Sequence, residues 1–366
     1  MAHSQRDLRL DLFKGIALIG IAVNHTVPSK AMLAAGGHYQ FGHLFEFNFA
    51  DVFVFLSGLV CGNVYGRVLE QQGFRAVQRK ALRRIGTLFT ANVATALACL
   101  LVVWAFGFGE VVPALHYPKH EHWWSALLGT AFFYNGLPYF DILSLYVLLL
   151  ALLPGMLWLH ARLGYWALLV GAVPYIAVNA PMLQFTIPRF GSFFGHPAAW
   201  QFLFFVAVVL GYRIPRNQLP PIDRRLAISC VLLILLGTDF FKQTHIFATW
   251  LSAKATCGPM RIIELLGVSY LVSQWLPRDL PAASQGFLAG LARLGQQSLP
   301  VFCSTMLYSY IGSYAVEAVH ATPYGHGIAV ALVAAATYVT GQLTQAISQE
   351  PPFFVRTQVT KRVAKS

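Results

Sequence analysis

The sequence NFADVFVFLSGLVCGNVYG, at residues 48–66, indicates how this chain folds. It contains a single charged residue, Asp51, in a run that matches the roughly 20 mostly apolar residues of a membrane-spanning helix. Comparable apolar runs occur along the whole chain, at residues 12–28, 85–107, 139–159, 164–181, 198–213, 225–241, 258–276, 298–318 and 327–347. We therefore predict an all-α, polytopic integral membrane protein with about ten transmembrane helices, forming one membrane domain over residues 1–366.

The composition supports a membrane protein and argues against several soluble classes. Hydrophobic residues make up 57% of the 366 residues and charged residues only 11%, whereas a soluble domain has about a quarter charged residues. The net charge of +12 lies in short segments between apolar runs, as at cytoplasmic helix ends, so we predict no nucleic-acid binding. The five cysteines are scattered without a CxxC pair, which predicts neither a disulfide framework nor a metal site.

The basic segments also predict the topology. Residues 67–84 carry six basic residues against Glu70, residues 213–225 carry four arginines, and both termini are basic. If all of these are cytoplasmic, the chain crosses an even number of times between Arg84 and Arg213. Five apolar pieces lie there, so one does not cross. We assign this role to the shortest, Trp123–Leu137, as a re-entrant or interfacial segment that could border a functional cavity.

Ionisable residues inside the first predicted helix are the strongest functional candidates, because such groups are costly in a bilayer. Lys14 and His25 are 11 residues apart, which places both on one face about 16 Å apart, with Lys14 toward the cytosol and His25 in the outer half. A histidine can accept and return a proton near neutral pH. The alternatives are an interfacial lysine and a histidine that bonds to a carbonyl at the helix end.

Further polar residues lie near the predicted outer face. Asp51 could orient a histidine or act as an N-cap, and Asp141 could likewise be a functional group or a cap. Lys254, Arg261 and Glu264 cluster around the start of one helix. They could form an anion or sugar site, or Arg261 and Glu264 could simply pair at i, i+3.

Two local patterns invite structural explanations. Ser57 and Gly58 are expected to allow close helix packing. The histidines at 116, 120 and 122 have a spacing similar to that of metal ligands, but no supporting cluster accompanies them, so we predict a solvated outer loop.

An ordered set of short motifs resembles the OpgC-type proteins, the succinyltransferases of osmoregulated periplasmic glucans. The set covers nearly the whole chain and comprises RDLRLD at 6–11, Asn24–His25, FVFLSG at 53–58, DILSLY at 141–146, PAAWQ at 197–201, GPMR at 258–261 and SLPVFC at 298–303. The sequence departs from the family pattern at Ser144, where proline is usual, and at Ala253–Ala255 and Glu264. The departures at Ala253–Ala255 and Glu264 put the acyl group and the acceptor in question.

The resemblance extends to the acyltransferase-3 superfamily, in which a basic residue and a histidine share the first helix, here Lys14 and His25. It implies an inner-membrane enzyme with both termini cytoplasmic. An acyl-CoA, expected to be succinyl-CoA, would be the donor substrate, with no permanently bound cofactor. The acceptor would be a periplasmic glycan, the chain would contact lipid, and an oligomer is possible.

The resemblance also implies roles for single residues. His25 and Asp51 would be catalytic, and CoA phosphates would bind Lys14, Arg79, Arg83 and Arg84. The acceptor or acyl group would contact Asp141, Tyr146, Trp200, Lys254, Arg261 and Glu264. The alternative function is a glycan or lipid transporter or flippase without covalent chemistry, although no inverted repeat is visible.

Overall fold

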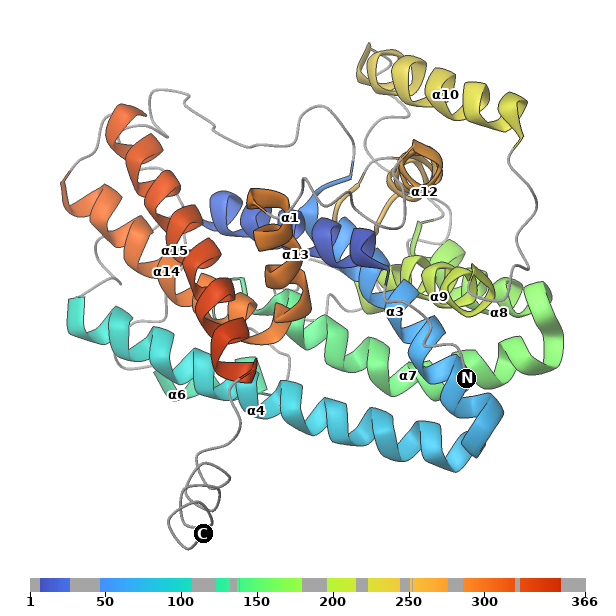
Figure 1. The fold of residues 1–366 in the computed structure, drawn as a ribbon, viewed down its shortest axis with the longest axis horizontal. Coiled ribbons are helices and arrows are strands. Elements are labelled where there is room, and N and C mark those ends of the chain that lie inside the picture. The colour runs from blue at the N-terminus through green and yellow to red at the C-terminus, as the bar shows by residue number, and fades with distance from the viewer. Residues whose placement is uncertain are drawn as a thin grey trace, which may run out of the picture.

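The computed structural model of the chain is built of helices and turns, and no strand occurs in the part that it describes (Figure 1). That part comprises residues 7–26, 47–106, 123–131, 137, 139–179, 196–214, 223–243, 251, 253–275, 286–319 and 323–349. The predicted all-α class is confirmed. Each apolar run predicted from the sequence coincides with a helix, with shifted ends.

The helices follow the chain in a simple order. Their bounds are α1 (Leu8–His25), α3 (Phe49–Gln72), α4 (Phe74–Phe106), α6 (Trp123–Ala131), α7 (Asp141–Leu163), the short 3₁₀ turn η3 (Gly164–Trp166), α8 (Ala167–Asn179), α9 (Pro197–Arg213), α10 (Arg224–Gln243), α12 (Pro259–Trp275), α13 (Phe287–Gln296), α14 (Ser298–Ala318) and α15 (Pro323–Gln349).

Several helices have the length and composition of membrane spans. Among the described residues, four stretches are both long and apolar enough to cross a bilayer: Phe49–Gln72, Phe74–Ala105, Asp141–Asn179 and Pro323–Ser348. Helix α1 has 18 residues but contains three charged ones, and α9 is apolar but has only 17. The chain is therefore a membrane protein by its helices, and the count of about ten crossings stays a prediction.

The basic segment 67–84 is helical rather than a loop, which corrects the expectation from the sequence. Helix α3 continues to Gln72 and α4 begins at Phe74, so Gly73 alone forms the turn, with a φ of 78° that glycine adopts without steric cost. The 33 residues of α4 extend about 50 Å, well beyond a hydrocarbon core of about 30 Å. Five of the six basic residues thus occupy the end of α4 that projects from the apolar part, and Arg67 lies near the end of α3.

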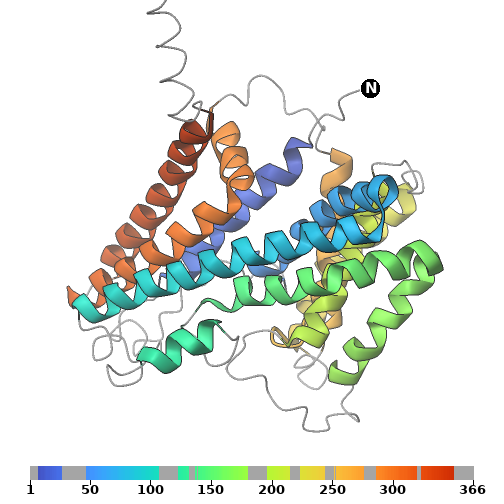
Figure 2. The same cartoon turned by 90° about the horizontal axis from the view of Figure 1, so that it is seen from below.

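The predicted re-entrant segment contains the short helix α6. Its nine residues rise only about 14 Å, which is too short to cross a bilayer. Asn92 on α4 donates to the Thr130 carbonyl (3.5 Å) and to Ser144 on α7 (3.4 Å), and the Leu137 N–H donates to Thr130 Oγ1 (2.9 Å). Helix α6 therefore belongs to the bundle, beside α4 (Figure 2). Residues 132–136 and 138 lie outside the described residues.

Glycines bring α3 and α9 into backbone contact. Gly58, Gly62 and Gly66 recur every fourth residue, and a Cβ on Gly62 would lie 2.0 Å from the Val208 carbonyl oxygen. A Cβ on Gly211 of α9 would lie 2.0 Å from the Leu59 carbonyl oxygen. The expectation that Gly58 allows close packing is confirmed, and the whole small-residue face packs one pair of helices.

Helix α13 was not predicted from the sequence, yet it packs directly on α1 and crosses it in Figure 1. A Cβ on Gly15 would lie 1.9 Å from the Leu291 carbonyl oxygen, and one on Gly295 would lie 1.8 Å from the Asp11 carbonyl oxygen. Ten residues are too few for a span, but Phe287, Leu288, Leu291 and Leu294 have helical spacing. That spacing is the signal that could have revealed the helix.

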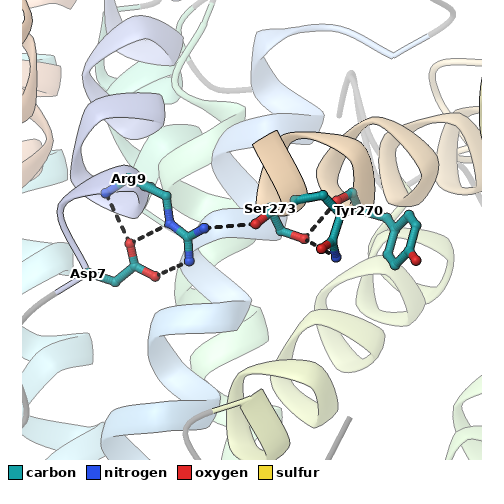
Figure 3. Close-up of polar contacts among 5 residues, drawn as sticks. Asp7, Arg9, Tyr270 and Ser273 are labelled. Atoms are coloured by element: carbon teal, nitrogen blue, oxygen red, sulfur yellow. Dashed lines mark hydrogen bonds and ion pairs between the residues drawn. The ribbon is translucent and has the colours of Figure 1, made fainter. Parts of the chain in front are cut away.

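A polar clamp joins the start of α1 to the end of α12 (Figure 3). Arg9 donates from Nε and Nη2 to the Asp7 carboxylate (2.9 and 2.8 Å) and from Nη1 to the Ser273 carbonyl oxygen (3.0 Å). Asp7 also caps α1 by accepting from the Arg9 backbone N–H (3.1 Å), and its bond to the guanidinium raises the pKa of Arg9. The clamp satisfies a terminal carbonyl of α12 that the helix itself leaves without a donor.

Candidate functional site

The C-terminal end of α1, which presents His25, is fixed by side chains from α14 and α15. Ser313 donates to the His25 carbonyl oxygen (3.5 Å), and Ser309 donates to the carbonyl oxygen of Ala22, about one turn earlier (3.4 Å). His326 Nε2 lies 3.1 Å from the Thr26 carbonyl oxygen. Because a helix end leaves its last carbonyls without intrahelical donors, these contacts hold the end of α1 in place. No sequence pattern predicted these contacts.

The ring of His25 stacks on the ring of Tyr139, with a centroid separation of 4.0 Å and an interplanar angle of 19°. His25 Nδ1 is buried and has no hydrogen-bond partner among the described residues. Tyr139 has a φ of 71°, in the left-handed region that is unusual for a bulky residue. Within the part of the chain that the structure describes, Tyr139 stacks on the imidazole, and it was not among the predicted site residues.

Asp51 lies at the start of α3 and pairs with Arg261 of α12 through its Oδ2 atom. Both side chains are buried, with 1% and 6% of their surfaces exposed. Asn48 is the N-cap of α3, and Asp51 completes a capping box as the third helical residue by accepting the Asn48 N–H (2.7 Å). The interpretation of Asp51 as the N-cap itself was wrong.

The sequence predicts that Asp51 orients the ring of His25, but the structure shows other contacts for both residues. In the described part of the chain, the His25 ring makes no hydrogen bond to Asp51, and Asp51 Oδ1 has no hydrogen-bond partner. Arg261 forms an ion pair with Asp51, which lies on a different helix. Glu264 is itself buried, with 1% of its surface exposed.

Lys254 lies on a turn whose backbone is held by α8 and α9. Three consecutive backbone carbonyls of this turn accept hydrogen bonds. The carbonyl of residue 255 accepts from the His196 N–H (2.7 Å) and from Trp200 Nε1 (3.3 Å). The carbonyl of residue 256 accepts from the Asn179 side chain (3.0 Å), and that of residue 257 accepts from the Tyr175 hydroxyl (3.0 Å). Cys257 has a φ of 47°. These bonds hold the turn in a conformation that non-glycine residues rarely adopt.

Lys254 connects this turn to the other polar groups. Partial desolvation and then the charge of Arg261 lower the pKa of Lys254, while the carboxylates of Asp51 and Asp141 act in the opposite direction. Lys254 also lies within electrostatic range of His25. We name His25, Asp51, Asp141, Lys254 and Arg261 the outer cluster.

A second polar group lies deeper along the same helices. Cys61 Sγ on α3 is 3.5 Å from the Tyr146 hydroxyl on α7, and the charges of Lys14, Arg84 and Lys80 reach this thiol. Lys14 is 9% exposed, so it is buried in the bundle rather than extended to an interface. We name Lys14, Cys61, Lys80, Arg84 and Tyr146 the inner cluster.

Two helices give the same separation between the clusters. Lys14 and His25 are 11 residues apart on α1, which corresponds to about 16 Å, and Asp51 and Cys61 are 10 residues apart on α3, which corresponds to about 15 Å. Helix α1 runs from the inner to the outer cluster, and α3 runs back. The two clusters therefore lie at two levels of one bundle, about half a bilayer thickness apart.

The structure brings some of the predicted site residues together and places others apart. Arg79 and Arg83 are exposed on α4, whereas Arg84 is half-buried and the exposed Lys80 places its ammonium over the Tyr65 ring of α3 (5.4 Å from the ring centroid). Trp200 is completely buried, and its indole N–H supports the Lys254 turn. Tyr146 belongs to the inner cluster instead of lying with the groups expected to contact an acceptor.

The described residues contain no group of three or more side chains arranged to hold a metal ion. The histidines at 116, 120 and 122 lie outside the described residues. The two clusters instead offer acid–base and anion-binding chemistry.

Comparison with known proteins gives one result. A family model described as OpgC protein matches residues 6–349, which is nearly the whole chain. No curated protein and no solved structure matches it.

Proposed function

Because the chain belongs to the OpgC protein family, we propose that it is a transmembrane O-acyltransferase. It would move an acyl group, with succinyl as the expected one, from cytosolic acyl-CoA to a periplasmic glucan or related glycan. The observation that carries the proposal is the arrangement of the two clusters. A histidine ring whose buried Nδ1 has no partner among the described residues lies at one level, and a group of cations lies at the other.

The inner cluster would receive the donor. The charges of Lys14, Lys80 and Arg84 all act on the buried Cys61 thiol, and cations of this kind bind phosphate oxygens through charge-assisted hydrogen bonds. The exposed Arg79 and Arg83 would attract the anionic donor to the projecting end of α4. The thioester would then reach about 15 Å along α1 and α3 to the outer cluster.

The outer cluster would perform the transfer. A ring nitrogen of His25 takes the proton of a sugar hydroxyl, and the hydroxyl oxygen attacks the thioester carbonyl carbon. The C–S bond breaks, an ester C–O bond remains, and the CoA thiolate leaves with the proton returned by the imidazolium. An acyl-His25 intermediate uses the same residue in two steps, and rapid quenching followed by intact-protein mass spectrometry distinguishes the two routes.

The ion pair assigns different roles to the cations of the outer cluster. Arg261 is buried against Asp51 and would position the start of α3. Lys254 is exposed on its fixed turn, so it is the cation that could meet the free carboxylate of a succinyl group. The charge of the acyl group would then be read by Lys254 rather than by Arg261.

The test is mass spectrometry of periplasmic glycans from cells that lack the protein, express it, or express His25→Ala at matched membrane levels. We expect a mass increase of one or more succinyl groups that requires His25. A different acyl mass changes the donor and keeps the mechanism. Unmodified glycan in all three strains, with glycan moved across the membrane, would make the protein a transporter.

A further inference from the structure

We infer that Tyr139 is a positioning residue that fixes the imidazole of His25 for proton transfer. The inference rests on the proposed function, because it assigns a role relative to the proposed base. Tyr139 is not expected to react. Its role is to restrict which way the ring of His25 faces.

The contacts of His25 leave this task to Tyr139. The backbone end of α1 is held by Ser313 and its neighbours, but these contacts do not restrict rotation of the side chain. Among the described residues, Nδ1 has no hydrogen-bond partner that could orient the ring. The nearly parallel stack at 4.0 Å is the contact that selects one ring plane.

Tyr139 occupies this position at the expense of backbone strain. A bulky residue at a φ of 71° persists only where its surroundings determine the conformation, and such residues are frequent at functional sites. The neighbouring chain is fixed on both sides. Phe140 donates its N–H to the Leu137 carbonyl oxygen (3.3 Å), and Leu137 donates to Thr130 Oγ1 (2.9 Å).

This anchoring explains what α6 contributes to the site. Thr130 belongs to α6, and its carbonyl accepts from the buried Asn92 of α4 (3.5 Å). Contacts therefore run from α4 through α6 to the turn that carries Tyr139, and from Tyr139 to His25 on α1. A segment too short to cross the membrane thus places one aromatic ring against the proposed base.

Two substitutions separate the ring from the strain. Tyr139→Phe keeps the stacking ring and the strained backbone. Tyr139→Asn removes the ring but introduces a residue that tolerates positive φ, so the fold is expected to be retained. Each variant is purified as the full chain, and kcat and KM are measured for acyl transfer to glucan, with thermal unfolding in the same detergent.

We expect Tyr139→Phe to retain kcat within about threefold, and Tyr139→Asn to lose about 100-fold in kcat at unchanged KM, the loss typical of a misplaced catalytic group. Tyr139→Asn should unfold at the wild-type temperature or higher. Equal loss in both variants would assign the effect to the hydroxyl and overturn the inference. Retained kcat in Tyr139→Asn would overturn it as well.

A parallel His25→Ala variant keeps the two proposals distinct. If His25→Ala is inactive while Tyr139→Asn is fully active, only the role of Tyr139 fails. If folded His25→Ala remains active, the proposed function of His25 fails, whatever Tyr139 does.

Discussion

The Asp51 carboxylate and the Arg261 guanidinium form a buried ion pair that joins α3 to α12 across 210 residues of sequence. A buried pair is a weak source of net stability, but removal of one partner leaves an uncompensated charge. Asp51 also accepts the Asn48 N–H, and an asparagine at position 51 can preserve that bond through its amide oxygen. The charge can therefore be removed without removal of the cap.

We predict that Asp51→Asn and Arg261→Gln each destabilise the protein by about 3 kcal/mol, because each removes one partner of a buried ion pair. The double variant should be more stable than either single variant, with a coupling of about 1 kcal/mol or more. The free energies of unfolding of the wild type, the two single variants and the double variant, measured in one detergent, complete the double-mutant cycle. If the losses of stability in the two single variants add up to the loss in the double variant, the two residues do not act as a unit.

The inner cluster predicts which cations of α4 matter for the donor. Lys80→Gln and Arg84→Gln should each raise the KM for acyl-CoA roughly 10- to 100-fold, the equivalent of one charge-assisted hydrogen bond. Arg79 and Arg83 are exposed on the same turns and are not among the cations whose charges reach the Cys61 thiol, so the effects of Arg79→Gln and Arg83→Gln should be smaller and should vanish at high salt. Steady-state kinetics at two ionic strengths provides the comparison, and equal KM increases at all four positions would contradict the assignment.

Lys254 predicts selectivity between donors. Lys254→Met should lower kcat/KM for succinyl-CoA about tenfold or more relative to acetyl-CoA, because the free carboxylate loses its cation. Lys254→Arg retains the charge and should retain most of the preference. Competition between the two donors in one assay measures the ratio directly. A parallel fall for both donors would mean that Lys254 does not read the acyl charge.

Close packing of α3 on α9 predicts a contrast between two glycines. Gly62→Ala places a Cβ against the Val208 carbonyl oxygen and should destabilise the protein by about 1–3 kcal/mol. A Cβ on Gly86 of α4 would meet no atom of the described residues within 4 Å, so Gly86→Ala should be neutral or stabilising by up to about 1 kcal/mol. The unfolding temperature of Gly62→Ala should therefore fall, whereas that of Gly86→Ala should stay unchanged or rise.

The positions of the helices were largely predictable because a bilayer demands long apolar runs, whereas their ends were not. Arginine and lysine are good helix formers, so the basic segment after α3 continued as α4 with Gly73 alone as the turn. Helix α13 was missed because ten amphipathic residues do not resemble a span.

The site was predictable only in part. The shared face of Lys14 and His25 follows from the helical period, but the pairing of Asp51 with Arg261 depends on helices distant in sequence. The role of Tyr139 depends on a backbone conformation that its residue type disfavours, and no sequence pattern reports such a conformation.

The supports at the end of α1 have a consequence for biosynthesis. His326 contacts the carbonyl of Thr26 from 300 residues further along the chain, and Ser313 contacts that of His25 from 288 residues away. During translation, the first helix enters the membrane long before the residues that hold its end have been made. A nascent or truncated chain therefore lacks an assembled site, and activity should appear only when the last helix has been inserted.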